Sequence, residues 1–150
     1  MSESLHSAFE ELKRADHLLY VSLKYSRTVD VIKSVIERLI ACYDTSLLAL
    51  LEHLKEQKKI KEIPGSPIAR AKLAKEMQAD DKVITEGVEF YLLLRKISKA
   101  EFTRAREFRR HVTMTVVVDG GTIEVNIDKI QEYFDQTKAF VAHIKNIVIK

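Results

Sequence analysis

The sequence predicts a mainly α-helical bundle of four to five helices, with one β-hairpin inserted before the C-terminal helix. Apolar residues recur at steps of three and four over most of the chain, which is typical of amphipathic helices. Between Val112 and Ile127 the period drops to two, which is typical of strands. The 150 residues match one ordinary domain that can bury a core. We therefore expect a single domain over 1–150, with the hairpin at about 112–127.

Breaks in the apolar pattern divide the helical part of the chain. The first helix is expected from Ser4 to Lys24, and Ser26 or Thr28 can cap a second helix of roughly 30 residues. More than half of the circumference of this second helix is apolar, so it should lie at the centre of the bundle or at a subunit interface. Two prolines in KEIPGSPI stop it, and the Ser-Pro pair in that segment can start another. The remaining pattern predicts a short helix that ends near residue 79, a long helix that ends near residue 110 and a last helix over about 128–147.

The alternating segment predicts how its two strands pair. Four apolar residues of the first strand and three of the second must share one face. A two-residue turn at Asp119-Gly120 achieves this, whereas a three-residue loop would place apolar residues opposite polar ones. The apolar face must then pack on helices, because a two-stranded ribbon alone is marginal. The expected opposite pairs are Val116 with Ile123, Met114 with Val125 and Val112 with Ile127.

The first strand of this hairpin carries the main prediction about partners. Its sequence, VTMTVVV, has neither a charge nor a proline, and an exposed strand edge of that kind invites pairing with another chain. We therefore expect a homodimer, or a partner that adds a strand. The dimer could form through the hairpin edge or through the long second helix. The leading functional hypothesis is a non-enzymatic interaction or scaffold module that acts as a homodimer.

Composition and charge exclude several classes of protein. The formal net charge of +3 is too small to attract nucleic acid or membranes over the whole surface, so a basic site has to be local. A single cysteine, Cys42, excludes an internal disulfide and fits a reducing compartment. No apolar run approaches the about 20 residues that span a bilayer, and the N-terminal residues lack a signal-peptide core. We expect a cytoplasmic protein without membrane contact. Charged residues at 31% and only six Asn and Gln residues favour a thermophilic source.

One local basic cluster stands out, in which five cationic residues lie within eight positions. Guanidinium groups match phosphate oxygens, so the cluster is a candidate site for RNA or another phosphate-bearing ligand. The alternative is that the cations stabilise the C-terminal end of a helix against its dipole. Phe102 and Phe108 fall on the expected core stripe, so we expect no aromatic side chains for base stacking. The candidate residues are Arg104, Arg106, Arg109, Arg110 and His111.

The same cluster contains an R-x4-H spacing, from Arg106 to His111. The chain here resembles the HEPN-type helical domains, small bundles that include many RNases. In that family an R-x4-6-H motif late in the chain pairs across a dimer to form the active site. The resemblance implies that Arg106 and His111 form a catalytic pair and that the substrate is RNA.

A second resemblance lies in the stretch LLYVSLKYSRTVDVIKSVIERLI, from Leu18 to Ile40. It is similar to a stretch found in uncharacterised archaeal proteins. This likeness implies an archaeal source and assigns no activity.

Two acidic pairs are candidate magnesium ligands: Glu86-x-x-Glu89 and Glu132-x-x-Asp135. They are similar to the pairs of all-α nucleotide pyrophosphatases, which hold magnesium between facing helices, and they give a third hypothesis, a magnesium-dependent nucleotide hydrolase. Both pairs, however, lie about 120° from the centres of the apolar stripes, so we expect them to face water. We expect no metal and no cofactor.

Asp16 breaks the pattern of the first helix. It projects within roughly 30° of the middle of the apolar stripe, where a carboxylate needs a partner. Arg27, Lys33 or the hydroxyl of Tyr43 could reach it, in which case it forms a buried structural ion pair. Alternatively, Asp16 lines a ligand pocket together with Tyr20 and Lys24.

Overall fold

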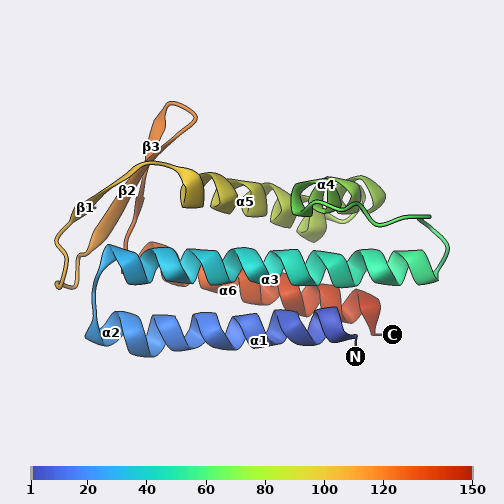
Figure 1. The fold of residues 1–150 in the computed structure, drawn as a ribbon, viewed down its shortest axis with the longest axis horizontal. Coiled ribbons are helices and arrows are strands. Elements are labelled where there is room, and N and C mark those ends of the chain that lie inside the picture. Colours follow the sequence, from blue (N-terminus) through green and yellow to red (C-terminus); the bar gives the residue numbers. More distant parts are fainter. Residues whose placement is uncertain (1, 150) are drawn as a thin grey trace.

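The longest apolar pattern of the sequence forms the central helix α3 (Val29–Glu56), around which the other helices pack (Figure 1). In the computed structural model, which describes residues 2–149, α3 begins at Thr28, whose side-chain oxygen accepts a hydrogen bond from Val31 N–H at 3.3 Å. Thirteen of its 28 residues are buried. The predicted cap and the predicted central position of this helix are therefore both confirmed.

The first predicted helix is present but is not regular throughout. It consists of α1 (Glu3–His17), a π-helical turn over Leu18–Ser22 and the single turn α2 (Leu23–Tyr25). Its buried stripe contains the small residues Ala8 and Ala15, whereas the larger Phe9 is only half-buried. Because the stripe is centred on these alanines, it is turned away from Asp16, which is exposed. The expectation that Asp16 lies within the apolar stripe is wrong.

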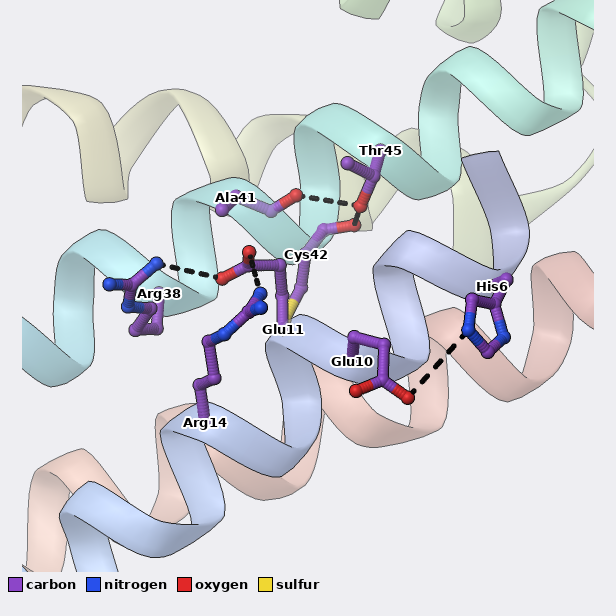
Figure 2. Close-up of polar contacts among 8 residues, drawn as sticks. All are labelled: His6, Glu10, Glu11, Arg14, Arg38, Ala41, Cys42 and Thr45. Carbon is purple, nitrogen blue, oxygen red and sulfur yellow. Dashed lines mark hydrogen bonds and ion pairs between the residues drawn. The ribbon is translucent and has the colours of Figure 1, made fainter. Parts of the chain in front are cut away.

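A polar contact joins α1 to α3 on the surface of the bundle (Figure 2). The carboxylate of Glu11 on α1 accepts hydrogen bonds from Arg14 at 2.6 Å and from Arg38 of α3 at 3.2 Å. Cys42 lies close to this contact and is fully buried. Burial and the negative charge of Glu11 raise the pKa of the Cys42 thiol to about 12, so the thiol stays protonated at neutral pH and is a poor nucleophile.

The linker and the Ser66 cap that follows it were predicted from the sequence and are confirmed, whereas the cap of the next helix was not predicted. Ser66 caps α4 (Pro67–Met77) by accepting a hydrogen bond from Ala69 N–H at 3.2 Å. Asp81 caps α5 (Lys82–Lys99) by accepting one from Ile84 N–H at 3.2 Å. Among residues 2–149, no helix combines the length and the apolar character that crossing a bilayer requires.

The prediction that the fourth helix continues to residue 110 is wrong. Helix α5 ends at Lys99, because Ala100 has an extended backbone with φ −71° and ψ 152°. The chain then forms a strand, β1 (Phe102–Ala105), that was predicted as helix. This strand pairs antiparallel with β2 (Thr113–Val118), which pairs in turn with β3 (Gly121–Val125). The insertion is therefore a three-stranded sheet of order β1-β2-β3.

The pairing of the predicted hairpin is confirmed where the two strands form a ladder. Met114 faces Val125 and Val116 faces Ile123. Asp119 and Gly120 form the turn with φ values of 52° and 80°, as a two-residue turn with both central residues in the left-handed region requires. The expected pair of Val112 with Ile127 lies beyond the ladder, since α6 (Ile127–Val148) begins there.

The third strand changes the prediction about the sheet edge. Strand β2 is central, with β3 on one side and β1 on the other, from Phe102 opposite Val116 to Ala105 opposite Thr113. The segment VTMTVVV is therefore not an open edge, and the expectation of an edge on which a second chain would pair is wrong. The outer strands are short, four residues in β1 and five in β3.

The two faces of the sheet differ in character. One face carries Val112, Met114, Val116 and Val125, which are buried against the helices. The other face is open and mostly polar. Besides Ala105 and Val117, it holds four threonines and one glutamate: Thr103, Thr113, Thr115, Thr122 and Glu124. Helix α6 starts at the end of β3, where the side chain of Asn126 caps it by accepting a hydrogen bond from Lys129 N–H at 2.8 Å. The predicted fold class, mainly α with a small β insertion before the last helix, is confirmed.

Candidate functional site

The predicted basic cluster lies mostly in the loop between β1 and β2, residues 106–111, and not at a helix end. This loop lies at the end of the molecule where α2 leads into α3, at the left of Figure 1. Two hydrogen bonds hold it there. Phe108 N–H donates to the carbonyl of Arg27 at 2.6 Å, and Val29 N–H donates to the carboxylate of Glu107 at 3.1 Å. The alternative explanation, cations that offset a helix dipole, therefore does not apply to this loop.

Two residues of this loop have unusual backbone conformations. Arg106 has φ 55° and Phe108 has φ 64°, in the left-handed region that non-glycine residues rarely adopt. Such residues cost of order 1–3 kcal/mol each and persist only where the surroundings fix them. Here the hydrogen bonds of Phe108 and Glu107 supply that constraint. The loop is therefore held in one defined shape.

Arg104 is the member of the cluster that is neutralised. It lies on β1, donates a hydrogen bond to Asp30 at 2.9 Å and forms an ion pair with Glu107 at 3.6 Å. The hydrogen bond with Asp30 and the charges of both acids raise the pKa of its guanidinium. Its guanidinium also lies 5.1 Å from the ring centre of Phe102. We conclude that Arg104 attaches the sheet to α3 and is not free to bind a ligand.

The other four members of the cluster remain exposed. All four are exposed to solvent, and within residues 2–149 none of Arg106, Arg109, Arg110 and His111 forms an ion pair. Uncompensated positive charge on a fixed loop is what a phosphate group would bind. Four of the five predicted candidate residues are thus available at one place.

Aromatic side chains lie beside these cations, against expectation. Phe108 was predicted in the core, but its side chain is 76% exposed in the loop. Tyr25, at the end of α2, is 81% exposed, and the hydrogen bond from Phe108 to Arg27 brings the loop to within two residues of it. An aromatic ring that is exposed close to cations can stack on a planar group of a ligand. We call the following set the tip surface: Tyr25, Arg106, Phe108, Arg109, Arg110 and His111.

A small cavity lies next to the tip surface and shares three of its residues. It has a volume of about 180 Å³. Arg106, Arg110 and His111 line it from the loop, while Thr113 and Glu124 line it from the polar face of the sheet. Residues 126–128, at the start of α6, complete it. We call it the loop cavity. Its wall carries both signs of charge, since Glu124 and Asp128 stand with the two arginines.

The second predicted group, Asp16, Tyr20 and Lys24, does not form a pocket. All three side chains are exposed. Tyr20 packs edge-on against Phe134 with the ring centres 6.4 Å apart, and its hydroxyl accepts a hydrogen bond from Gln131 at 2.8 Å. Tyr20 therefore joins the end of the first helix to α6. Neither the buried ion pair nor the ligand pocket expected for Asp16 is formed.

The acidic pairs face water, as predicted. Glu86 and Glu89 on α5, like Glu132 and Asp135 on α6, are exposed. Glu89 pairs with Lys75, and Glu132 pairs with Lys129 at 3.7 Å. In the described part of the chain, no group of three His, Cys, Asp or Glu residues is placed to hold a metal ion.

A polar network that was not predicted from the sequence connects two helices and has a structural role. The hydroxyl of Tyr91 on α5 donates to Asp44 of α3, and Arg95 donates to the same hydroxyl at 3.2 Å. Burial raises the pKa of Asp44, although Tyr91 and Arg95 act in the opposite direction. The network joins α3 to α5 away from the tip surface.

Comparison with known proteins adds no relative. The chain matches no protein-family model, no curated protein and no solved structure. The functional argument therefore depends on the chemistry of the tip surface and the loop cavity.

Proposed function

We propose that the protein binds single-stranded RNA through the tip surface. The observation that carries this proposal is the combination of exposed aromatic rings with uncompensated arginines on one fixed loop. Proteins that bind single strands combine basic side chains along the backbone with aromatic side chains on which bases stack. Phe108 and Tyr25 supply the rings, and Arg106, Arg109 and Arg110 supply the charge.

The surroundings of the tip surface favour RNA over DNA, and a single strand over a duplex. The open face of the sheet beside the loop carries hydroxyl groups, and Thr113 and Asn126 line the loop cavity. These groups can donate hydrogen bonds to a ribose 2′-hydroxyl or accept them from it, and this hydroxyl distinguishes RNA from DNA. Exposed rings find partners only where bases are unstacked, which is the usual state of single-stranded loops and ends.

Cleavage of the bound RNA is a separate step that the HEPN resemblance implies. Arg106 and His111, the pair expected from that resemblance, both line the loop cavity. This common location supports a test of cleavage, in which His111→Ala should abolish any RNase activity without a change in melting temperature. Binding by the tip surface does not require it.

The homodimeric scaffold stays a prediction, but the main reason for expecting a dimer no longer holds. A dimer was expected because of an open edge along residues 112–118, and β1 occupies this edge over residues 113–116. The magnesium-dependent hydrolase has less support still, because the four acids concerned are exposed and three of them pair with lysines.

A titration of a fluorescent ten-nucleotide uridine RNA, U10, followed by anisotropy, tests the proposal. If three phosphates are contacted, affinity should fall about 20-fold between 50 and 200 mM salt. The triple variant R106A/R109A/R110A should lose most of the binding and most of the salt dependence.

The matched control removes the same charge from the opposite end of α3. Lys55, Lys59 and Lys61 are exposed there, far from the tip surface (Figure 1). The control K55A/K59A/K61A should bind U10 like the wild type. Equal losses in both triple variants, or no binding of U10 by the wild type, would overturn the proposal. The same titration with a DNA strand of ten thymidines, compared with U10, measures the preference for RNA over DNA.

A further inference from the structure

The loop cavity carries a pattern of charge that phosphate binding does not explain. Arg106 and Arg110 line it together with Glu124 and Asp128, and within the described chain neither arginine forms an ion pair with either acid. Carboxylates repel a phosphate group, so a site for phosphate alone would not have two of them in its wall. The wall suits a ligand that offers hydrogen-bond acceptors on one side and donors on another.

The size of the cavity limits what can enter. At about 180 Å³ it is smaller than the roughly 300–1,000 Å³ of pockets that hold drug-sized molecules. A whole nucleotide would not fit inside, but a single base can enter while its sugar and phosphate stay on the tip surface outside. The adjoining arginines and Phe108 are placed to hold that backbone and the neighbouring base.

Among the four RNA bases, guanine matches the wall best. Its O6 and N7 atoms are two adjacent acceptors, which an arginine fork contacts in a bidentate way. Its N1–H and N2 amino groups are two adjacent donors. One carboxylate can accept a hydrogen bond from each of them, which is again a bidentate contact. Adenine, cytosine and uracil lack this combination of an acceptor pair and a donor pair on neighbouring edges.

We propose that the loop cavity takes a guanine base of the bound strand, with an arginine of the loop on O6 and N7 and Glu124 on N1 and N2. This inference rests on the proposed function, because it names the base that the same site selects. Glu124 is the specificity-determining residue, since its carboxylate accepts from donors that only guanine presents as a pair.

The experiment compares three ten-nucleotide RNAs by anisotropy: U10, and U10 with one central uridine replaced by guanosine or by adenosine. For the wild type, guanosine should raise affinity about tenfold over adenosine, within the range of one bidentate base contact. In E124Q this ratio should fall to about one. The ratio is the readout, because loss of a negative charge strengthens the binding of every RNA.

The control E101Q removes an exposed acid that does not line the cavity, and it should keep the wild-type ratio. A second variant, R110A, should lower the ratio by removing a donor to O6 and N7. Glu124 and Arg110 are both exposed, so neither substitution disturbs the core, and unchanged melting temperatures verify this. An equal affinity of the wild type for the guanosine and adenosine strands would overturn the inference.

Failure of the inference can be distinguished from failure of the proposed function. If U10 binds with a steep salt dependence but guanosine gives no preference, RNA binding stands and the guanine site is wrong. If no RNA binds, thermal shifts with guanosine 5′-monophosphate and adenosine 5′-monophosphate test the cavity by itself. If only the guanine nucleotide stabilises the protein, and E124Q loses this effect, the cavity is a guanine site and the proposal of strand binding is wrong. Equal shifts with the two nucleotides, or no shift with either, would overturn both the guanine site and the proposed RNA binding.

Discussion

Phe108 shows how one backbone conformation exposes an aromatic ring, on which the proposed RNA binding depends. With φ at 64° and its N–H bound to the carbonyl of Arg27, the residue turns its ring into solvent, where a base can stack on it. We predict that F108A lowers affinity for U10 about tenfold, because one base–aromatic stack contributes roughly 1–3 kcal/mol. The slope of affinity against salt should not change, since no charge is removed.

The control for this prediction is V83A, which removes an exposed apolar side chain at the start of α5, away from the tip surface. It should bind U10 with the affinity of the wild type. If the two variants weaken binding to the same extent, Phe108 has no specific role in stacking.

Gly87 allows α5 to approach α6 closely. A Cβ atom at this position would lie 2.3 Å from two ring carbons of Phe140, which is buried. Alanine normally stabilises a helix interior relative to glycine, by roughly 0.5–1 kcal/mol. Here we predict that G87A destabilises the fold by about 1–3 kcal/mol, the usual cost of overpacking a core.

Urea denaturation measures this effect. The second substitution F140L in the G87A background should recover part of the loss, because the smaller side chain leaves room for the methyl group. A G87A variant more stable than the wild type would contradict the close approach of these helices.

At the scale of whole elements, one contact joins the start of α5 to the end of α6. Asp81 caps α5 and its carboxylate lies 2.7 Å from the ring nitrogen Nε2 of His143. Partial burial acts to raise the pKa of Asp81, but the hydrogen bonds with His143 and with Ile84 N–H outweigh it and lower the pKa below 3.8. The ionised carboxylate therefore stabilises the folded state.

A carboxylate with a lowered pKa contributes stability that is complete above its unfolded pKa and is lost as the pH falls through its folded pKa. For Asp81 the loss begins near pH 3.8 and continues below it. We predict that D81N, which retains a capping oxygen, has a lower melting temperature than the wild type at pH 7. The difference should shrink between pH 4 and pH 2. A constant difference over this range would contradict the role of the charge.

The elements that the sequence predicted well depend on local signals. Caps at Thr28 and Ser66 and the turn at Asp119-Gly120 each involve residues only a few positions apart. The end of α5 was not predictable in this way, because no glycine or proline follows it. The strand that replaces the predicted helix, β1, pairs with residues 113–116, which lie beyond the loop that follows it.

The candidate site was predictable only in part, for the same reason. Charge alone indicated the arginines, but Arg104 is neutralised by Asp30, which is 74 residues away. Phe108 seemed to continue the stripe of a helix that in fact ends at Lys99. Tyr25 could have been suspected, since it is an aromatic residue in a predicted break, outside the apolar stripe. Asp16 was misplaced because the buried face of α1 includes Ala8 and Ala15, small residues that a pattern of large apolar side chains does not reveal.

At the scale of the whole molecule, the helices hold the sheet and its loop at one end of the bundle (Figure 1). The net charge is only +3, so the field of the whole protein contributes little to the attraction of RNA. The proposed binding therefore depends on the local grouping of arginines, exposed rings and the loop cavity. The rest of the surface should not interact with RNA at moderate salt.

Photo-crosslinking of the wild-type protein to a 4-thiouridine form of U10, with the crosslinked residues identified by mass spectrometry, tests this central claim most directly. We predict that the crosslinks fall on Tyr25 and Phe108 and within residues 106–111, and that unlabelled U10 competes for them. Crosslinks distributed over the helices, or concentrated at the opposite end of α3, would contradict the account.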